Sequence, residues 1–449
     1  MGPRLKLLIL SFYYPPDLSA GSFRAKALVE ALHALRPDDL RVEVITTMPN
    51  RYHSMVSEAP EREDHGWLTI RRIRLPDHQS GMADQTKAFA AFALRARRET
   101  VGGHWDAVLA TSSRLMTAAL GAHIARRSGA PLYLDIRDLF ADTTSDLLAR
   151  SPLRVLLPIF RVLERRTLRA AARVNLVSAG FLPLLRDVAP QHDYRLFTNG
   201  IDDEFLDTDF SRRTSASDVP LILYAGNIGE GQGLHNVLPQ AARLLSGRAR
   251  IRVLGDGGRR RQLDAALAAA GVSDIELLPP VPRTGLYDHY READILFLHL
   301  NDHDAFRKVL PSKIFEYAAT GKPILAGVAG YAAEFLRAEV PGAEVFDPCD
   351  ADGMAAAFER LVTGRGAFDR SAFCSKYARK AIMARMAQDI LELAEARQAA
   401  TLSPGRSCRP VRCQWRLRSE FSGPAVVTGG PCSGRPIAPG VPARSCRFR

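Results

Sequence analysis

The 449-residue sequence lacks a hydrophobic run long enough to span a bilayer. No apolar stretch approaches the roughly 20 residues that a membrane-spanning helix requires. The N-terminal MGPRLKLLIL passes at once into SFYYPPD, which predicts a first strand and not a signal peptide. We therefore expect a cytoplasmic protein.

Several ligand-binding signatures are also missing. The six cysteines fit no zinc spacing, and four of them lie beyond residue 400. No glycine loop ends in the lysine–serine pair of a P-loop. The glycine spacing and the position of the following acid fit a dinucleotide-binding fingerprint poorly. No side chain stands out as a covalent nucleophile.

The net charge of +12 is concentrated at the C-terminus. Residues 401–449 hold nine arginines, no lysine and one acid, so this segment supplies +8 of the total. It is rich in Pro, Gly, Ser and Arg without periodicity, which predicts a disordered tail. We interpret it as a non-native extension; the alternative is a basic arm for acidic lipid or nucleic acid.

The remaining chain reads as two series of alternating strands and helices, which predicts an α/β fold with two Rossmann-like domains. Residues 1–200 are expected to form the first domain, 201–220 a linker, 221–375 the second domain, and 376–400 a helix that returns to the first. Strands are predicted at 5–10, 41–47, 67–75, 106–110, 131–136 and 174–178, and then at 221–225, 250–254, 275–278, 295–300, 324–328 and 343–346.

The segment PSKIFEYAATGKP, residues 311–323, is the most informative. It predicts a helix that starts near Pro311 and Ser312 and ends before Gly321. A helix start attracts anions, and Lys313 adds a cation there. Glu316 could accept two hydrogen bonds from a vicinal diol. The alternative is a capped surface helix with an i, i+3 ion pair.

Glycine loops follow two predicted strands of the second half. Gly226 to Gly233 follow LILYA, and Gly255 to Gly258 follow IRVL. Glycines in such places let backbone amides approach phosphates. Each loop alone is weak evidence, whereas two loops and the 311–323 helix in one domain predict a diphosphate site.

In the first half, strand ends carry further candidates. Asp135, Arg137 and Asp138 end a predicted strand, where ligands gather in open α/β sheets. Gly21 lies in a loop before a helix predicted from Phe23 to Leu35, where the backbone could approach a ligand. The alternatives are an Arg–Asp pair that closes a loop and an ordinary tight turn.

Residues 147–177 form a basic amphipathic stretch. Seven arginines and one acid, Glu164, stand among apolar residues. This pattern is typical of a helix that lies on anionic lipid, so we expect peripheral contact with the inner face of the plasma membrane. The alternative is a helix packed on the sheet with a solvated basic face.

The sequence resembles the GT-B glycosyltransferases of retaining family 4. The match is greatest to the bacterial branch that builds cell-surface polysaccharides, similar to fucosamine transferases. The matching segments are YYPPDLSAGSFRAKALVEAL, LDIRDLF, TNGID, LYAGNIGEGQGL, VLGDGG and LPSKIFEYAATGKPILAG, over residues 5 to about 395.

This resemblance implies roles for single residues. Gly21 would lie by the reacting bond with Arg24 nearby. Gly226, Asn227 and Lys313 would hold the donor diphosphate, and Glu316 would bind the ribose.

The sequence departs from the family at three positions. Many members have an arginine and a lysine where this chain has Asn227 and Gln232, so Arg307, Lys308, Lys313 or Arg259 are candidate replacements. The family's second acid is replaced by Lys308. That change fits a deoxy or N-acetylated amino sugar as the donor.

The predicted function is sugar transfer from a nucleoside diphosphate sugar, expected to be a UDP-sugar, to a lipid-linked saccharide. The predicted catalytic residues are Gly21, Arg24 and Asp138. The predicted donor-binding residues are Gly226, Asn227, Gln232, Gly255, Arg307, Lys313 and Glu316.

The resemblance implies retention of configuration and no metal or other cofactor, and no DxD motif stands in a plausible loop. Nucleic acid is not an expected partner. The alternatives are a sugar-nucleotide epimerase and a non-catalytic protein that binds nucleotide sugars or nucleic acid.

Overall fold

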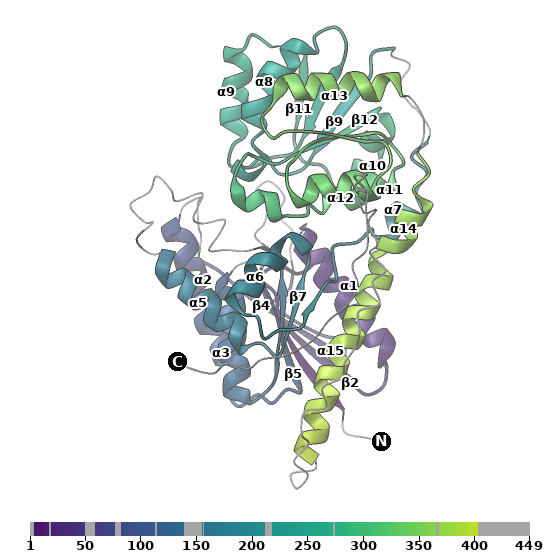
Figure 1. The fold of residues 1–449 in the computed structure, drawn as a ribbon. Helices are drawn as coiled ribbons and strands as arrows, with labels where there is room; N and C mark the ends of the chain where they lie inside the picture. The colour runs from purple at the N-terminus through teal and green to yellow at the C-terminus, as the bar shows by residue number, and fades with distance from the viewer. Residues whose placement is uncertain are drawn as a thin grey trace, which may run out of the picture. The chain divides into compact units, whose positions relative to one another are not determined.

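The computed structural model describes residues 4–17, 19–49, 59–76, 82–112, 115–138, 155, 157–211, 218–272, 274–364 and 368–402 (Figure 1). By its contacts Met1–Leu402 forms one compact unit, separate from Ser403–Arg449. The tail that the composition predicts to be disordered begins at residue 401, and nearly all of it lies outside the described residues.

The first half of Met1–Leu402 is built on an eight-stranded sheet. Its strand order is β3-β4-β2-β1-β5-β6-β7-β8, and every neighbouring pair is parallel except β3 with β4. The strands are β1 (Leu5–Leu10), β2 (Leu40–Thr47), β3 (Arg62–Asp64), β4 (Leu68–Ile73), β5 (Ala107–Thr111), β6 (Leu132–Ile136), β7 (Arg173–Leu176) and β8 (Tyr194–Arg195).

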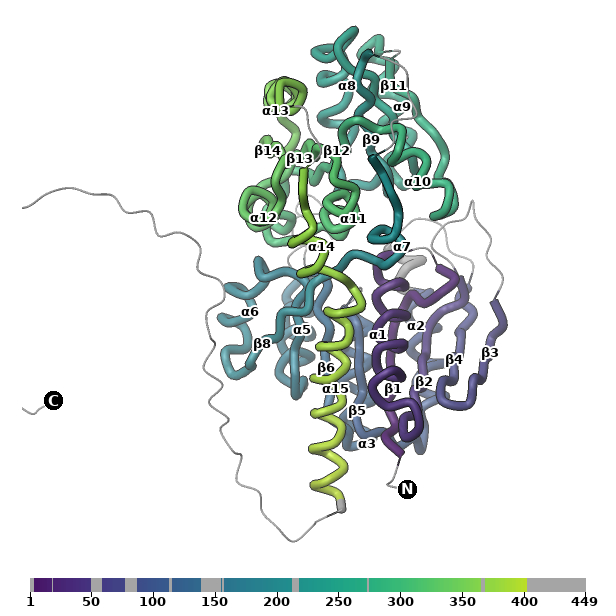
Figure 2. Tube along the Cα trace, turned by 90° about the vertical axis from the view of Figure 1, so that its right-hand side faces the viewer, coloured from purple at the N-terminus to yellow at the C-terminus, as the bar shows by residue number. Residues whose placement is uncertain are grey.

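Helices cover both faces of this sheet. On one face α2 packs on α3, and α3 packs on α5; on the other face α1 lies beside α15 (Figure 2). The helices of this half are α1 (Ala20–Leu35), α2 (Met82–Glu99), α3 (Leu115–Ser128), α5 (Leu157–Ala170), η2 (Ala179–Phe181), α6 (Leu182–Val188) and α7 (Asp203–Leu206).

The second half is built on a six-stranded parallel sheet of order β11-β10-β9-β12-β13-β14. The strands are β9 (Leu221–Ala225), β10 (Arg250–Leu254), β11 (Ile275–Leu278), β12 (Ile295–His299), β13 (Ile324–Gly327) and β14 (Ala343–Phe346). The helices are η3 (Glu230–Gln232), α8 (Leu234–Leu244), α9 (Arg260–Ala269), α10 (Arg283–Glu292), η4 (Asp304–Lys308), α11 (Lys313–Ala319), α12 (Tyr331–Glu339), α13 (Ala351–Thr363), α14 (Ser371–Tyr377) and α15 (Arg379–Leu402).

The central strands form because they are almost continuously apolar and are covered on both faces. All five residues of β9 and of β12 are buried, as parallel strands between two helix layers require. The predicted α/β class with parallel sheets is confirmed. In each sheet the strand order reverses at a central strand, β1 in the first and β9 in the second. Open α/β sheets bind ligands at such a point.

Two differences from the predicted helix bounds have a visible cause. Helix α1 begins at Ala20 and not at Phe23, because the Ser19 hydroxyl accepts a hydrogen bond from the Ser22 amide at 3.2 Å and caps the helix there. The predicted C-terminal helix is broken at Ala378, which has extended backbone angles between α14 and α15.

The chain passes between the two sheets twice, and these two passages pair with each other. Ile201 on the first passage forms a parallel bridge with Ala378 on the second. The Ile201 amide donates to the Tyr377 carbonyl at 2.8 Å, and the Arg379 amide donates to the Ile201 carbonyl at 2.7 Å. The division into domains at residues 200, 220 and 375 stays a prediction.

Candidate functional site

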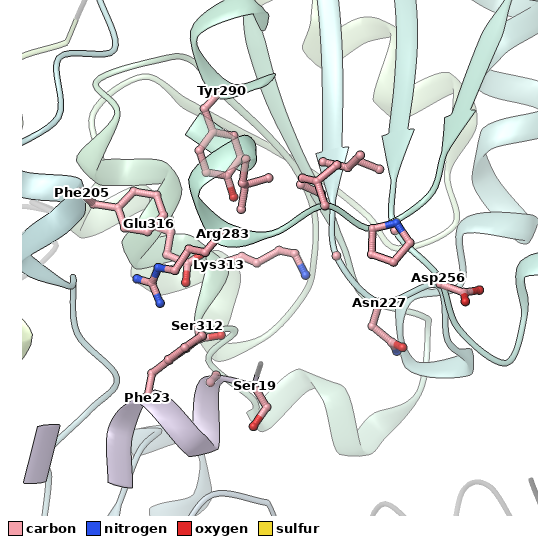
Figure 3. Close-up of a pocket in the computed structure, with 18 residues that line it drawn as sticks. Ser19, Phe23, Phe205, Asn227, Asp256, Arg283, Tyr290, Ser312, Lys313 and Glu316 are labelled. Atoms are coloured by element: carbon pink, nitrogen blue, oxygen red, sulfur yellow. The ribbon is translucent and has the colours of Figure 1, made fainter. Parts of the chain in front are cut away.

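A cavity of about 270 Å³ lies at the carboxyl ends of β9, β10 and β11 (Figure 3). Its wall also includes the starts of α1 and α11, and part of α10. The lining residues are Ser19, Ala20, Phe23, Phe205, Ala225, Gly226, Asn227, Leu254, Gly255, Asp256, Pro280, Val281, Arg283, Leu286, Tyr290, Ser312, Lys313 and Glu316.

The two glycine turns after β9 and β10 lie against each other. The Gly226 amide donates to the Leu254 carbonyl at 2.8 Å, and the Ile228 amide donates to the Asp256 carbonyl at 2.9 Å. Both Gly226 (φ 148°) and Gly255 (φ 151°) have backbone angles that other residues rarely adopt. A Cβ on Gly255 would overlap the Gly226 carbonyl oxygen. Glycine is therefore required for the two turns to close this end of the cavity.

Lys313 is the cation that lies against the first glycine turn. A Cβ on Gly226 would overlap its ammonium group, which lies 5.2 Å from the centre of the Tyr224 ring. The Tyr224 hydroxyl donates to the Asn227 carbonyl at 2.6 Å and so fixes the same turn. Figure 3 shows Lys313 extending from α11 toward the strand ends that carry Asn227 and Asp256. The Ser312 hydroxyl makes no capping hydrogen bond to α11, contrary to the predicted cap.

Glu316 lines the same cavity one helical turn after Lys313. Burial raises the pKa of its carboxyl group, and the neighbouring Arg283 and Lys313 act in the opposite direction. Arg283 is already held by Asp202 and by Glu204, the latter at 2.9 Å, and its guanidinium lies 4.4 Å from the Phe23 ring. Glu316 therefore faces the cavity as a carboxyl group between two cations.

The arrangement suits an anionic, hydroxyl-bearing ligand. Fixed amides of two turns and an ammonium group converge on one end, where they can neutralise phosphate oxygens. The carboxylate of Glu316 is an acceptor for hydroxyl groups. The start of α1, with Ser19 and Ala20 in the wall, adds the positive end of a 16-residue helix.

The structure brings together five of the seven predicted donor-binding residues: Gly226, Asn227, Gly255, Lys313 and Glu316. Gln232 does not line the cavity. Its Oε1 accepts from the Asn227 Nδ2 at 2.8 Å and from the Gly229 amide at 3.3 Å, so it orients the turn. Arg307 is exposed and paired with Asp302 and Asp304, at 3.3 and 3.6 Å.

The three predicted catalytic residues are placed differently, and their catalytic roles stay predictions. Gly21 is in the first turn of α1, next to two lining residues, and a Cβ there would lie 2.6 Å from Arg137 Nη1. Asp138 borders a different, smaller cavity beneath α3 and α5.

Arg24 is 1% exposed and forms part of a buried network. Its guanidinium binds both oxygens of Asp135, at 2.8 and 3.0 Å. It also donates to the carbonyls of Thr198 and Phe197, at 2.6 and 2.8 Å. Arg24 does not line the cavity, and these contacts favour a structural role.

Sequence reasoning missed part of the wall. Asp256 stands in the quoted loop VLGDGG and could have been found from that motif. Phe23, Phe205 and Arg283 carry no local motif, because they reach the cavity only through the packing of α1, α7 and α10.

Among the described residues, no group of three or more His, Cys, Asp or Glu side chains is arranged to hold a metal ion. Every helix in the part of the chain that the structure describes is too short or too polar to cross a membrane.

Residues 207–381 match the family Glycosyl transferases group 1. The chain is 25% identical over 342 residues to the Escherichia coli K12 protein named "Putative colanic acid biosynthesis glycosyl transferase WcaI", which covers 71% of this chain and 82% of that protein. It is 36% identical over 118 residues to the D-inositol 3-phosphate glycosyltransferase of Xylanimonas cellulosilytica, a match that covers 25% of this chain and 27% of that protein.

Solved structures share the fold. Sucrose-phosphate synthase of Thermosynechococcus elongatus superposes with a TM-score of 0.70 at 15% identity, over 88% of this chain and all of that chain. HepE of Anabaena, solved with UDP-glucose, superposes with a TM-score of 0.60 at 15% identity, over 87% of this chain and all of that chain. WaaG, a glycosyltransferase of lipopolysaccharide biosynthesis, superposes with a TM-score of 0.56 at 13% identity, over 89% of this chain and all of that chain. The expected GT-B arrangement of two Rossmann-like domains is confirmed.

Proposed function

We propose that the chain transfers a sugar from a UDP-sugar to a lipid-linked saccharide; the match of residues 207–381 to Glycosyl transferases group 1 and the GT-B fold support this proposal. The transfer proceeds with retention of configuration and without a metal ion, in the synthesis of a cell-surface polysaccharide. The observation that carries this proposal is the convergence of Gly226, Asn227, Gly255, Lys313 and Glu316, from three separate segments, on one cavity.

In this proposal the donor diphosphate lies against the glycine turns and the Lys313 ammonium, and Glu316 accepts hydrogen bonds from the ribose. As the bond between the sugar and the diphosphate breaks, the electron pair leaves with the diphosphate. Fixed amides and a cation next to the growing charge lower the barrier without reorganisation, which is the main catalytic contribution we assign to the site.

Similarity to named proteins supports the choice of donor and pathway. The HepE structures contain UDP-glucose or UDP. WaaG acts in lipopolysaccharide biosynthesis, and the Escherichia coli relative is named for colanic acid biosynthesis. UDP-sugars and an acceptor on a lipid carrier are the substrates that fit these names.

Helix α5 supports peripheral contact with an anionic membrane on the cytoplasmic side. Ile159 and Val162 are 62% and 50% exposed. Exposed arginines flank them at positions 161, 165, 166 and 169 of the same helix. Exposed apolar side chains among cations are what an interfacial helix presents to anionic lipid. Residues 147–154 and 156 of the predicted stretch lie outside the described residues.

The proposal is tested first by donor binding. We expect UDP and one or more UDP-sugars to raise the melting temperature of the full chain more than GDP- or dTDP-sugars do, because binding to the native state alone stabilises it. Lys313→Ala and Glu316→Gln should each weaken UDP binding at least about tenfold in calorimetry. Equal binding by the wild type and both variants would contradict the proposed site.

The reaction type is tested separately. With a UDP-sugar and a membrane extract that contains lipid-linked saccharides, we expect labelled sugar to enter the lipid fraction at a rate that EDTA leaves unchanged. Release of an epimer from donor alone would identify the epimerase instead. Binding of UDP-sugars without transfer or epimerisation would favour a non-catalytic role.

A further inference from the structure

A second cavity, of about 380 Å³, lies at the C-terminal ends of α2 and α3. Its lining includes three guanidinium groups and two imidazoles, those of Arg97, Arg98, Arg127, His104 and His123. No carboxylate stands among the described residues that line it. It shares no residue with the cavity that holds Lys313 and Glu316. Since α2 and α3 both run away from the carboxyl ends of the strands, this cavity lies at the opposite edge of the first sheet.

The arginines of this cavity have no acidic partner within the described part of the chain. Glu99 is the nearest acid along α2, but it pairs with Arg71 at 3.3 Å and with Arg95 at 3.0 Å. Asp106, at the start of β5, accepts from the Lys6 amide at 2.8 Å. Both of these acids are therefore engaged, and the three exposed arginines around the cavity are balanced by solvent and not by a carboxylate of the described residues.

His123 adds a second, independent observation. Its Nε2 is shielded from solvent and has no hydrogen-bond partner in the described part of the chain. Burial and the nearby guanidiniums of Arg97, Arg127 and Arg126 lower the pKa of this imidazole. A shielded imidazole nitrogen without a partner costs free energy, and a turn of the ring toward a ligand in the cavity would satisfy it.

Stabilisation of the helix ends explains only part of this arrangement. Cations in the last turn of a helix interact favourably with its dipole. Arg126 in the last turn of α3 serves that purpose without lining the cavity. Dipole compensation accounts neither for the three guanidiniums around a single cavity nor for the shielded nitrogen of His123.

We propose that this cavity binds a phosphate group through Arg97, Arg98, Arg127 and His123. Guanidinium groups bind phosphate oxygens with paired hydrogen bonds, and an imidazole N–H supplies one more. The phosphate belongs either to a soluble ion or to the headgroup of an anionic lipid. Leu94 and Val101, which are 57% and 78% exposed, border the same cavity and suit the neighbourhood of a lipid chain. This inference does not depend on the proposed function.

The experiment uses the full chain and two phosphate sources. In the soluble arm, inorganic phosphate is titrated at constant ionic strength, and the C2 proton of His123 is followed by NMR across pH. The signal is assigned by its loss in His123→Gln. In the lipid arm, the chain is sedimented with vesicles of phosphatidylcholine alone or with phosphatidylglycerol added.

Arg127→Ala is compared with Arg126→Ala, a matched control that removes the same charge from the same turn outside the cavity. Lys313→Ala is a second control, intended to remove phosphate binding at the cavity lined by Lys313 and Glu316. We expect bound phosphate to raise the pKa of His123, and Arg127→Ala to weaken the binding about tenfold or more. Lys313→Ala should leave this binding within about twofold, since distant sites are independent. Arg126→Ala should do the same because Arg126 does not line the cavity and acts on it only as an exposed charge.

A His123 response to inorganic phosphate identifies a soluble ion as a ligand. Binding to phosphatidylglycerol vesicles that Arg127→Ala weakens and Arg126→Ala does not identifies a lipid headgroup. Either result supports the phosphate site. The inference is overturned if neither source gives a response, or if Arg127→Ala and Arg126→Ala weaken binding equally, since that would be the effect of general surface charge.

Discussion

Arg24 and Lys313 are two cations, one in each half of the molecule. Each stands in the first turns of a helix, and each was predicted to act in the reaction site. The structure gives Arg24 a complete set of partners: two carboxylate oxygens of Asp135 and two backbone carbonyls. Lys313 lies instead against a glycine turn at the wall of the cavity.

The difference shows what separates a structural cation from a ligand-binding one. Asp135 neutralises Arg24 where neither is exposed by more than 3%, so removal of either charge leaves the other buried. Lys313 lies instead in the wall of the cavity, against the turn that begins at Gly226, where a ligand in the cavity can reach it. We therefore expect Arg24 to act on stability and Lys313 on binding, and the following predictions test that contrast.

The largest effect is expected for Arg24→Met. The variant leaves the Asp135 carboxylate buried, with Asn175 as its remaining side-chain hydrogen-bond donor among the described residues. We expect this to lower the free energy of unfolding by about 3–5 kcal/mol. Urea unfolding measures it, and the double variant Arg24→Met/Asp135→Leu should recover most of the loss. Normal stability with lost activity would show that Arg24 acts in the reaction after all.

The next largest effect is expected for Gly226→Ala. The new Cβ would displace the Lys313 ammonium, and the positive φ would strain the turn by about 1–3 kcal/mol. We expect UDP binding to weaken by roughly 10–100-fold in calorimetry, as for loss of a charge-assisted hydrogen bond. Gly258→Ala is the control, because it lies in the second turn with open space around its Cβ position.

His299 extends the contrast to a buried neutral group. Its two ring nitrogens contact the Gln232 carbonyl and the Cys349 amide, at 2.6 and 2.9 Å, and burial lowers its pKa from 6.5 to about 4. Below pH 6.5 the unfolded chain takes up a proton that the folded chain does not. The free energy of unfolding should therefore fall as the pH drops toward 4, by up to about 1.4 kcal/mol per pH unit.

This contribution is isolated by comparing urea unfolding of the wild type and His299→Gln from pH 4 to pH 7. The variant should show a shallower loss of stability over this range. Identical pH dependence in the two proteins would mean that His299 has no part in it.

The smallest effect is expected for Arg307→Ala. Because Arg307 is exposed and its ion pairs with Asp302 and Asp304 are on the surface, both UDP affinity and stability should change by less than about 0.5 kcal/mol. A large loss of UDP affinity would show that Arg307 moves into the site when donor binds, as the sequence interpretation requires.

The sequence predicted the parallel strands well because their signal is local. The bounds of β1, β9, β10, β11 and β14 agree with the predicted ones. Of these, β1 and β9 are buried apolar strands, and such strands are continuous apolar runs in a sheet between two helix layers. β3 was missed because Arg62–Asp64 is a short polar edge strand, held only by its antiparallel pairing with β4.

At the site, the sequence predicted those residues whose motif and cavity contacts belong to the same short segment. Gly226, Gly255, Lys313 and Glu316 act through the backbone and side chains of their own segments. The contribution of Arg283 depends on Asp202 and Phe23, which are distant in sequence. The structural role of Arg24 depends on Asp135, 111 residues away. Such long-range neutralisation leaves no local pattern.

The pairing of Ile201 with Ala378 has a mechanical consequence. Since the two passages are hydrogen-bonded to each other at this point, they are joined there and are not two separate tethers. We expect any opening of one half from the other to pivot at this joint.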